Sequence, residues 1–109
     1  MELIDVYNNL RTLNLSDKFA RLLAAQIAFE TGNFKSPLFL EDNNPAGIMY
    51  INANYQKDSI PGRPFPAKES KNAKYAKLKT RQSGFRALVR IAYPALTAAN
   101  TPEKYAELL

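Results

Sequence analysis

The sequence predicts a mainly helical domain of α+β type, with a long central loop and at most a short hairpin. Apolar residues recur at helical spacing on both sides of the chain's middle. Residues 33–71 instead carry prolines, asparagines and glycines. The chain has 109 residues, of which 46% are hydrophobic, which suits one domain with a modest core. We therefore predict a single domain over residues 1–109.

Two helices are predicted in the N-terminal third. The first spans residues 2–13, with Val6 beside a stripe of apolar residues at helical spacing: Leu3, Ile4, Tyr7, Leu10 and Leu13. Ser16 is a suitable N-cap for a second helix from about Asp17 to Thr31. Gly32 is well placed to end that helix.

The central loop and the C-terminal third follow. Ile48, Tyr50 and Ile51 indicate a short hairpin near Gly47–Tyr55, and ordered structure is expected again over residues 73–78. Ser83 is expected to open a helix that Pro94 kinks or ends. One face of that helix carries Phe85, Leu88, Val89 and Ala92, and another carries Arg86 and Arg90. Thr101-Pro102-Glu103 predicts a short last helix.

The composition excludes several kinds of chemistry. The chain contains no cysteine and no histidine. Disulfides, thiol nucleophiles, imidazole bases and imidazole–zinc sites are therefore excluded, and we predict neither a metal nor a cofactor. Any proton transfer would have to use carboxylates, tyrosines or hydroxyls.

The net charge of +5 is concentrated in one stretch. Ten of the fifteen basic residues lie between Lys57 and Arg90, against only Asp58 and Glu69. This stretch suits an anionic polymer such as nucleic acid, teichoic acid or peptidoglycan, or is simply a solvated surface. No apolar run reaches the ~18 residues of a membrane span, and no signal peptide is visible. We expect no membrane insertion; a holin, cell lysis, a phage particle or an upstream domain would give access to the cell wall.

Glu30 is the residue that breaks the pattern of the second helix. Offsets of 0, 3, 4, 7, 8 and 11 mark one helix face, which comprises Phe19, Leu22, Leu23, Gln26, Ile27 and Glu30. The helix dipole disfavours a carboxylate at this end. Apolar neighbours and the carbonyl end of the helix both favour the protonated carboxyl, which can donate a proton to a leaving oxygen. Glu30 is a candidate general acid, unless it simply reaches solvent.

The segment after Glu30 has the composition of a sugar-binding loop. Asn43 and Asn44 supply amides that can pair with hydroxyl and acetamido groups. Gly47 lets the backbone approach a ligand closely. Aromatic side chains nearby can cover sugar faces. The alternative interpretation is an ordinary Asn/Pro turn.

Residues 25–48, AQIAFETGNFKSPLFLEDNNPAGI, resemble the glucosaminidase family of the lysozyme-like superfamily. The shared features are a helix ending in glutamate, Thr-Gly, a serine, and Asn-Asn-x-x-Gly-Ile. Residues 75–91, YAKLKTRQSGFRALVRI, and residues 100–106, NTPEKYA, are similar to later family segments in the same order. The compact loop also resembles that of short phage-encoded members.

The resemblance implies a lysozyme-like fold and cleavage of cell-wall glycan after N-acetylglucosamine. It implies Glu30 as general acid and suggests that Asn44, Tyr75 and Tyr105 line the sugar cleft. Many members carry a second glutamate in a β-lobe. Here Glu69 is the choice over Asp58, while Glu41 and Asp42 are expected to be solvated. Pro45-Ala46 and Asn33-Phe34 depart from the aromatic residues that are usual in the family.

Alternatives to this hydrolase remain open. Glycosidases usually use two carboxyl groups, so a loop acid, the substrate's acetamido group, or Glu30 alone as in lytic transglycosylases could complete the reaction. A non-catalytic cell-wall-binding or phage virion module is a rival. A nucleic-acid binder using Lys68, Lys71, Lys74 and Lys77 is a weaker one, because no known DNA-binding motif accompanies these lysines. The expected partners are peptidoglycan glycan strands and phage particle components, not nucleic acid.

Overall fold

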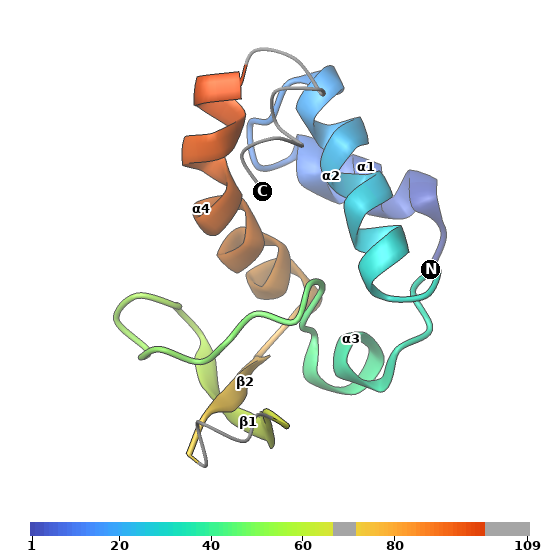
Figure 1. Cartoon of the computed structure of the whole chain (residues 1–109). Coiled ribbons are helices and arrows are strands. Elements are labelled where there is room, and N and C mark those ends of the chain that lie inside the picture. Colours follow the sequence, from blue (N-terminus) through green and yellow to red (C-terminus); the bar gives the residue numbers. More distant parts are fainter. Residues whose placement is uncertain (67–71, 100–109) are drawn as a thin grey trace.

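Helices and a small sheet occupy different parts of the molecule. The computed structural model describes residues 1–66 and 72–99. The elements are α1 (Leu3–Arg11), α2 (Asp17–Glu30), α3 (Pro37–Asp42), β1 (Ser59–Pro64), β2 (Lys74–Leu78) and α4 (Arg81–Ala99). Figure 1 shows α1, α2 and α4 grouped on one side, with the sheet on the other and α3 beside the C-terminal end of α2. About half of the described residues are helical, which confirms a small helix-rich domain with α+β elements.

The apolar core lies mainly among α1, α2 and α4, and it extends to Phe39 of α3, to Ala76 and Leu78 of β2, and to Phe34 and Ile48. Val6 and Leu10 of α1 are fully buried, together with Leu23 and Ile27 of α2. The buried residues of α4 are Phe85, Ala87, Leu88, Ala92 and Leu96. The predicted face of α1 was partly wrong, because Leu3 and Ile4 are half exposed and the buried face centres on Val6 and Leu10. None of the described helices is long and apolar enough to cross a membrane.

Hydroxyl side chains fix where α2 and α4 begin. The Ser16 hydroxyl accepts a hydrogen bond from the Phe19 amide at 3.3 Å, which confirms the predicted cap. Thr80 and Ser83 cap α4 reciprocally: the Ser83 amide donates to Thr80 Oγ1 at 3.0 Å, and the Thr80 amide donates to Ser83 Oγ at 2.9 Å. α4 therefore begins earlier than predicted, at Arg81, and Pro94 lies inside it.

The segment between α2 and β2 contains two elements that differ from the prediction. α3 was expected to be loop, yet Ser36 is extended, as a residue before proline should be, and caps α3 with Pro37 as its first residue. The hairpin predicted near Gly47–Tyr55 was wrong. Met49 forms only an isolated bridge with Tyr75, whereas β1 pairs antiparallel with β2.

Two prolines explain why β1 was not predicted from the sequence. Proline lacks the N–H that a sheet needs, so Pro61 and Pro64 argued against a strand. In a two-stranded sheet both strands are edges, and the pairing of β1 with β2 is irregular between Pro61 and Pro64. The register pairs Ser59 with Leu78. The helix predicted from Thr101 lies outside the described residues.

The start of α4 touches the end of α3. A Cβ added to Gly84 would lie 1.9 Å from the Asn43 carbonyl oxygen, so only glycine permits this approach. Arg81 reinforces it: its Nε donates to Asn43 Oδ1 at 3.1 Å, and its guanidinium lies 4.1 Å from the Phe39 ring centre. Burial lowers the pKa of Arg81 below its ordinary value. These contacts fix the orientation of the segment that follows α2.

Candidate functional site

The C-terminal end of α2 places Glu30 on the surface. The buried residues of α2 are Ala20, Leu23, Ala24 and Ile27, and the same spacing continues to Thr31, which is 2% exposed. The apolar face is therefore rotated by one residue from the predicted stripe. The prediction that Glu30 belongs to the buried face was wrong, because Thr31 occupies that place and Glu30 is exposed at its edge.

Thr31 fixes this end of the helix. Its hydroxyl donates to the Ile27 carbonyl at 2.6 Å and accepts from the Phe34 amide at 2.9 Å. The next three residues, Gly32, Asn33 and Phe34, all have positive φ angles, between 57° and 68°. Such a run reverses the chain sharply. The Thr31 carbonyl accepts from the Lys35 and Ser36 amides, while the Gly32 and Asn33 amides donate to carbonyls of the last turn of α2. The position of Glu30 is thus set by its neighbour.

Glu30 itself has no partner in the structure. Within residues 1–66 and 72–99, its carboxylate takes part in no hydrogen bond or ion pair. The preceding residue, Phe29, is 87% exposed, which is unusual for a phenyl ring. The end of α2 therefore presents an available carboxylate and an apolar ring to solvent.

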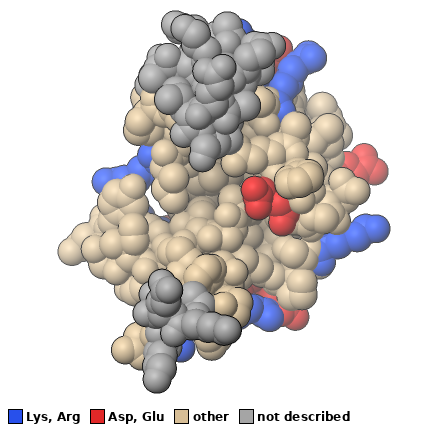
Figure 2. Space-filling model, viewed as in Figure 1, with Lys and Arg blue, Asp and Glu red and all other residues tan. Residues whose placement is uncertain are grey.

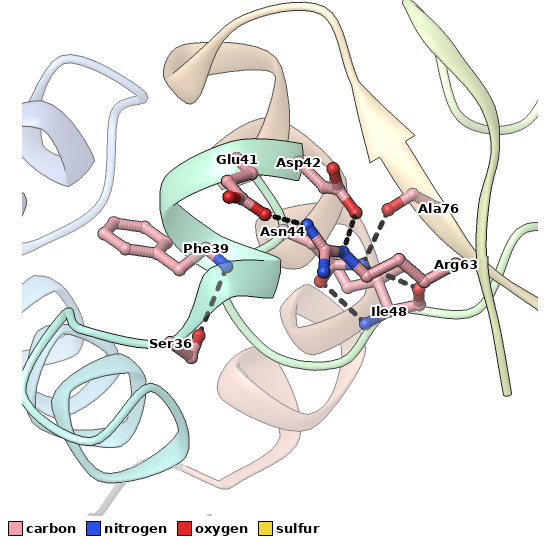
Figure 3. Close-up of polar contacts among 8 residues, drawn as sticks. All are labelled: Ser36, Phe39, Glu41, Asp42, Asn44, Ile48, Arg63 and Ala76. Atoms are coloured by element: carbon pink, nitrogen blue, oxygen red, sulfur yellow. Dashed lines mark hydrogen bonds and ion pairs between the residues drawn. The ribbon is translucent and has the colours of Figure 1, made fainter. Parts of the chain in front are cut away.

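Asn44, which was predicted to line the sugar cleft, is buried beneath its own loop. Its side chain is 1% exposed. Its Nδ2 donates to the carbonyls of Ile48 and Ala76, each at 2.9 Å, and its Oδ1 accepts from the Ile48 amide at 2.8 Å (Figure 3). With the amide occupied by backbone groups, Asn44 joins the loop to β2. A sugar in this region would contact the loop that Asn44 shapes rather than the amide itself.

Two further polar side chains shape this segment and were not predicted to. Gln56 is buried; its Nε2 donates to the Met49 carbonyl at 2.6 Å, and its Oε1 accepts from the Ile51 amide at 2.8 Å. Asn43, in a left-handed conformation, donates from Nδ2 to the Leu78 carbonyl at 3.0 Å. No periodicity in the sequence predicts either contact. An Asn or Gln in a proline-rich loop does, however, often form hydrogen bonds with the backbone.

Both acids of α3 pair with Arg63; Glu41 is exposed to solvent, as predicted, whereas Asp42 is not. Arg63 of β1 bonds Glu41 through Nη2 and Asp42 through Nε, the latter at 2.8 Å (Figure 3). Asp42 is buried, so the expectation that it is solvated was wrong. The hydrogen bonds to Asp42 and Glu41 raise the pKa of Arg63 further above its ordinary value. This pairing occupies both carboxylates and joins α3 to β1.

Tyr75 lies on β2 beside the same loop. Its ring packs edge-on against Phe65, with centres 5.4 Å apart, and a Cβ at Gly47 would lie 3.7 Å from it. The structure thus brings Tyr75, Gly47 and Asn44 together. No contact among the described residues joins them to the side chain of Glu30. Glu69 and Tyr105, the other two predicted site residues, lie outside the described residues.

Charge is unevenly distributed over the face shown in Figure 2. Lys and Arg atoms lie near its rim, whereas its middle is mostly uncharged with an acidic group. Lys74 and Lys77 of the nucleic-acid alternative lie on a strand, not on a helix, and Lys68 and Lys71 are outside the described residues. In the described part of the chain, no group of three or more acidic, histidine or cysteine side chains is arranged to hold a metal.

Comparison of the chain with known protein families, curated proteins and solved structures gave no match.

Proposed function

We propose that this protein hydrolyses the glycan strands of peptidoglycan, with Glu30 as the general acid. In this proposal the fold is lysozyme-like and the activity is of the N-acetylglucosaminidase type, directed at the β-1,4 bond after N-acetylglucosamine. The protein would act at the bacterial cell wall, alone or with phage particle components. The resemblance of residues 25–48 to the glucosaminidase family supports the proposal.

One observation carries the proposal: Glu30 is the residue of the shared motif that the fold does not use. Thr31 and Ser36 cap backbone amides, and Asn43 and Asn44 bind carbonyls of β2 and the loop. Gly32 and Gly47 have positive φ angles, and Ile48 is buried in the core. Each of these residues has a structural reason to be present, whereas the Glu30 carboxylate has no described partner.

The chemistry needs more than one group. A carboxylic acid can protonate the departing sugar oxygen, and a second carboxylate then activates water or attacks the sugar. Glu41 and Asp42 are both paired with Arg63 in the structure. Glu69 therefore stays the second carboxylate of the proposal. Phe29, the residue before Glu30, exposes a ring on which an apolar sugar face can stack.

The test compares the wild type with Glu30→Gln on purified peptidoglycan. We expect the wild type to clear the suspension and the variant to lose at least about 100-fold in rate, as removal of a general acid implies. Glu41→Gln is the matched control, because it removes a nearby exposed acid that is paired with Arg63. Circular dichroism checks that all three proteins are folded. Equal clearing by the wild type and Glu30→Gln would contradict the proposal.

The products distinguish hydrolysis from transglycosylation. Hydrolysis leaves a reducing N-acetylglucosamine end, whereas Glu30 acting alone as acid and base leaves an anhydro end. Mass spectrometry of the released fragments separates these by the mass of one water. Only the reducing end agrees with a hydrolase.

The exposure of Glu30 favours a second candidate, a non-catalytic cell-wall-binding or virion module. A general acid usually lies within an enclosed site, and Glu30 is exposed among the described residues. This candidate predicts that the protein sediments with peptidoglycan and releases no fragments. The clearing assay above therefore decides between the two functions.

A further inference from the structure

The outward face of α4 carries two arginines between two adjoining hollows. Arg86 and Arg90 are one helical turn apart, and both line each hollow. One hollow, of about 540 Å³, lies against the turn after α1 and is lined also by Leu13 and Val89. The other, of about 180 Å³, lies against the loop before β1 and is lined also by Tyr55 and Lys57. We call the two hollows together the α4 groove.

The cations of the α4 groove are available for a ligand. Among the described residues, neither Arg86 nor Arg90 forms an ion pair with a carboxylate. Arg90 lies over the Tyr55 ring, 4.5 Å from its centre, which orients the guanidinium without using its N–H donors. Lys57 adds a third positive charge and Asp58 a single negative one. The groove therefore has a net positive charge and unused fork-shaped donors.

The walls of the α4 groove indicate which anion fits. Leu13 and Val89 line the larger hollow and Ala87 the smaller one, so apolar surface alternates with the two guanidinium groups. A uniformly charged polyphosphate has no group that would cover apolar walls. A short peptide with free carboxylates and small apolar side chains matches both features, since planar carboxylates pair with arginine in a bidentate manner.

We propose that the α4 groove binds the peptide stems of peptidoglycan through their carboxylates, with Arg86 and Arg90 as the binding residues. This rests on the proposed function, because the stems are attached to the glycan strand that Glu30 would cut. The groove would make the protein selective for strands that still carry peptides. It is formed by residues other than those around Glu30.

The experiment measures binding rather than cleavage. Glu30→Gln protein, which leaves the strands intact, is sedimented with whole peptidoglycan and with glycan from which an amidase has removed the stems. The test variants in this background are Arg86→Gln and Arg86→Gln/Arg90→Gln. Arg86→Gln alone is informative, because Arg86 has no described contact whose loss would disturb the fold. The charge-matched control is Lys77→Gln/Lys79→Gln, which removes two exposed cations near the sheet.

We expect binding to whole peptidoglycan to weaken about tenfold for each arginine removed, and the control to change little. Purified stem peptide should compete with whole peptidoglycan. Glycan without stems should bind the arginine variants and their parent equally. Equal binding of both polymers by the parent, or equal weakening by the lysine control, would overturn the proposal. Arginine-dependent binding of duplex DNA with comparable affinity would also overturn it, in favour of a general polyanion surface.

The proposal can fail separately from the proposed function. If wild-type protein clears peptidoglycan but the arginine variants bind normally, the function stands and the stem site is wrong. If no clearing is found but stem-dependent binding is, the stem site stands and the protein is a binding module.

Discussion

The helical side of the molecule and the segment of residues 31–80 share one apolar core but differ in how much polar side chains add to it. α1, α2 and α4 bury aliphatic and aromatic side chains against each other. Residues 31–80 contain one short helix and a two-stranded sheet. They add Phe34, Phe39, Ile48, Ala76 and Leu78 to the same apolar core, and side chains that bond the backbone contribute further to their order. The side chains of Asn43, Asn44 and Gln56 bond backbone carbonyl and amide groups of this segment, including carbonyls of β2.

This difference follows from how much apolar surface each region has. Residues 31–80 are rich in proline and asparagine and contribute fewer apolar side chains to the core than the helices do, so polar bonds supply more of their order. Buried hydrogen bonds favour one specific geometry, because a buried donor or acceptor that is left unpaired costs free energy of folding. The helical side should tolerate core substitutions that keep the volume of the side chain. Residues 31–80 should instead be sensitive to the loss of a single side-chain amide. Glu30 lies at the boundary of the two.

The largest effect is expected where the two regions meet, at the contact between α4 and the end of α3. Alanine in place of a helical glycine usually stabilises a helix. At Gly84 the added Cβ would meet the Asn43 carbonyl at 1.9 Å, so we expect Gly84→Ala to destabilise the fold by at least about 3 kcal/mol. Urea unfolding measures this. Gly32→Ala is the control: nothing lies within 4 Å of its Cβ, and its positive φ should cost only about 1 kcal/mol. An unchanged midpoint for Gly84→Ala would show that α3 and α4 do not approach this closely.

The next effect compares an amide with an apolar side chain. We expect Asn44→Ala to cost about 2–3 kcal/mol, because it leaves buried backbone groups of Ile48 and Ala76 unpaired. Leu23→Ala, in the helical core, should cost about 3 kcal/mol. Hydrogen exchange should separate the two: Asn44→Ala loses protection mainly in residues 31–80, and Leu23→Ala loses it in the helices. Equal loss throughout in both variants would mean that the regions unfold as one unit.

The smallest effect concerns the helical side and depends on pH. The Tyr7 hydroxyl donates to Asp17, and this hydrogen bond holds the pKa of Asp17 below its ordinary value of 3.8. A depressed folded-state pKa stabilises the fold above the unfolded value, and that contribution is lost as pH falls through the folded value. Tyr7→Phe should therefore be less stable than wild type at neutral pH, with a difference that shrinks below about pH 4. A difference that grows in acid would contradict this assignment.

The helical side was easier to predict from the sequence than residues 31–80. Periodicity and caps were sufficient for α1, α2 and the core face of α4, since a helix repeats its signal every turn. α3 could have been predicted from Ser36-Pro37, which is both an extended pre-proline pair and a helix start. β1 could not, because Pro61 and Pro64 are tolerated only where the sheet has no further strand.

The candidate site was predictable in position but less so in the role of each residue. The end of α2 at Glu30 follows from local pattern, whereas the exposure of Glu30 does not. The pattern did not distinguish Thr31 from Glu30 as the buried residue, because a one-residue rotation of the face fits the apolar positions almost equally well. Asn44 was expected to face a sugar and instead bonds the backbone of β2. Contacts between residues so distant in sequence leave no periodic trace.

The residue that follows Asn44 has a consequence for how the protein ages. Asparagines deamidate slowly in solution: the next residue's backbone nitrogen, having lost its proton, attacks the side-chain carbonyl carbon, ammonia leaves and a succinimide forms. Asn44 is followed by Pro45, whose nitrogen carries no proton and cannot take part. The amide on which the loop most depends is therefore protected from this route of spontaneous chemical damage, whatever the storage time or the alkalinity of the medium.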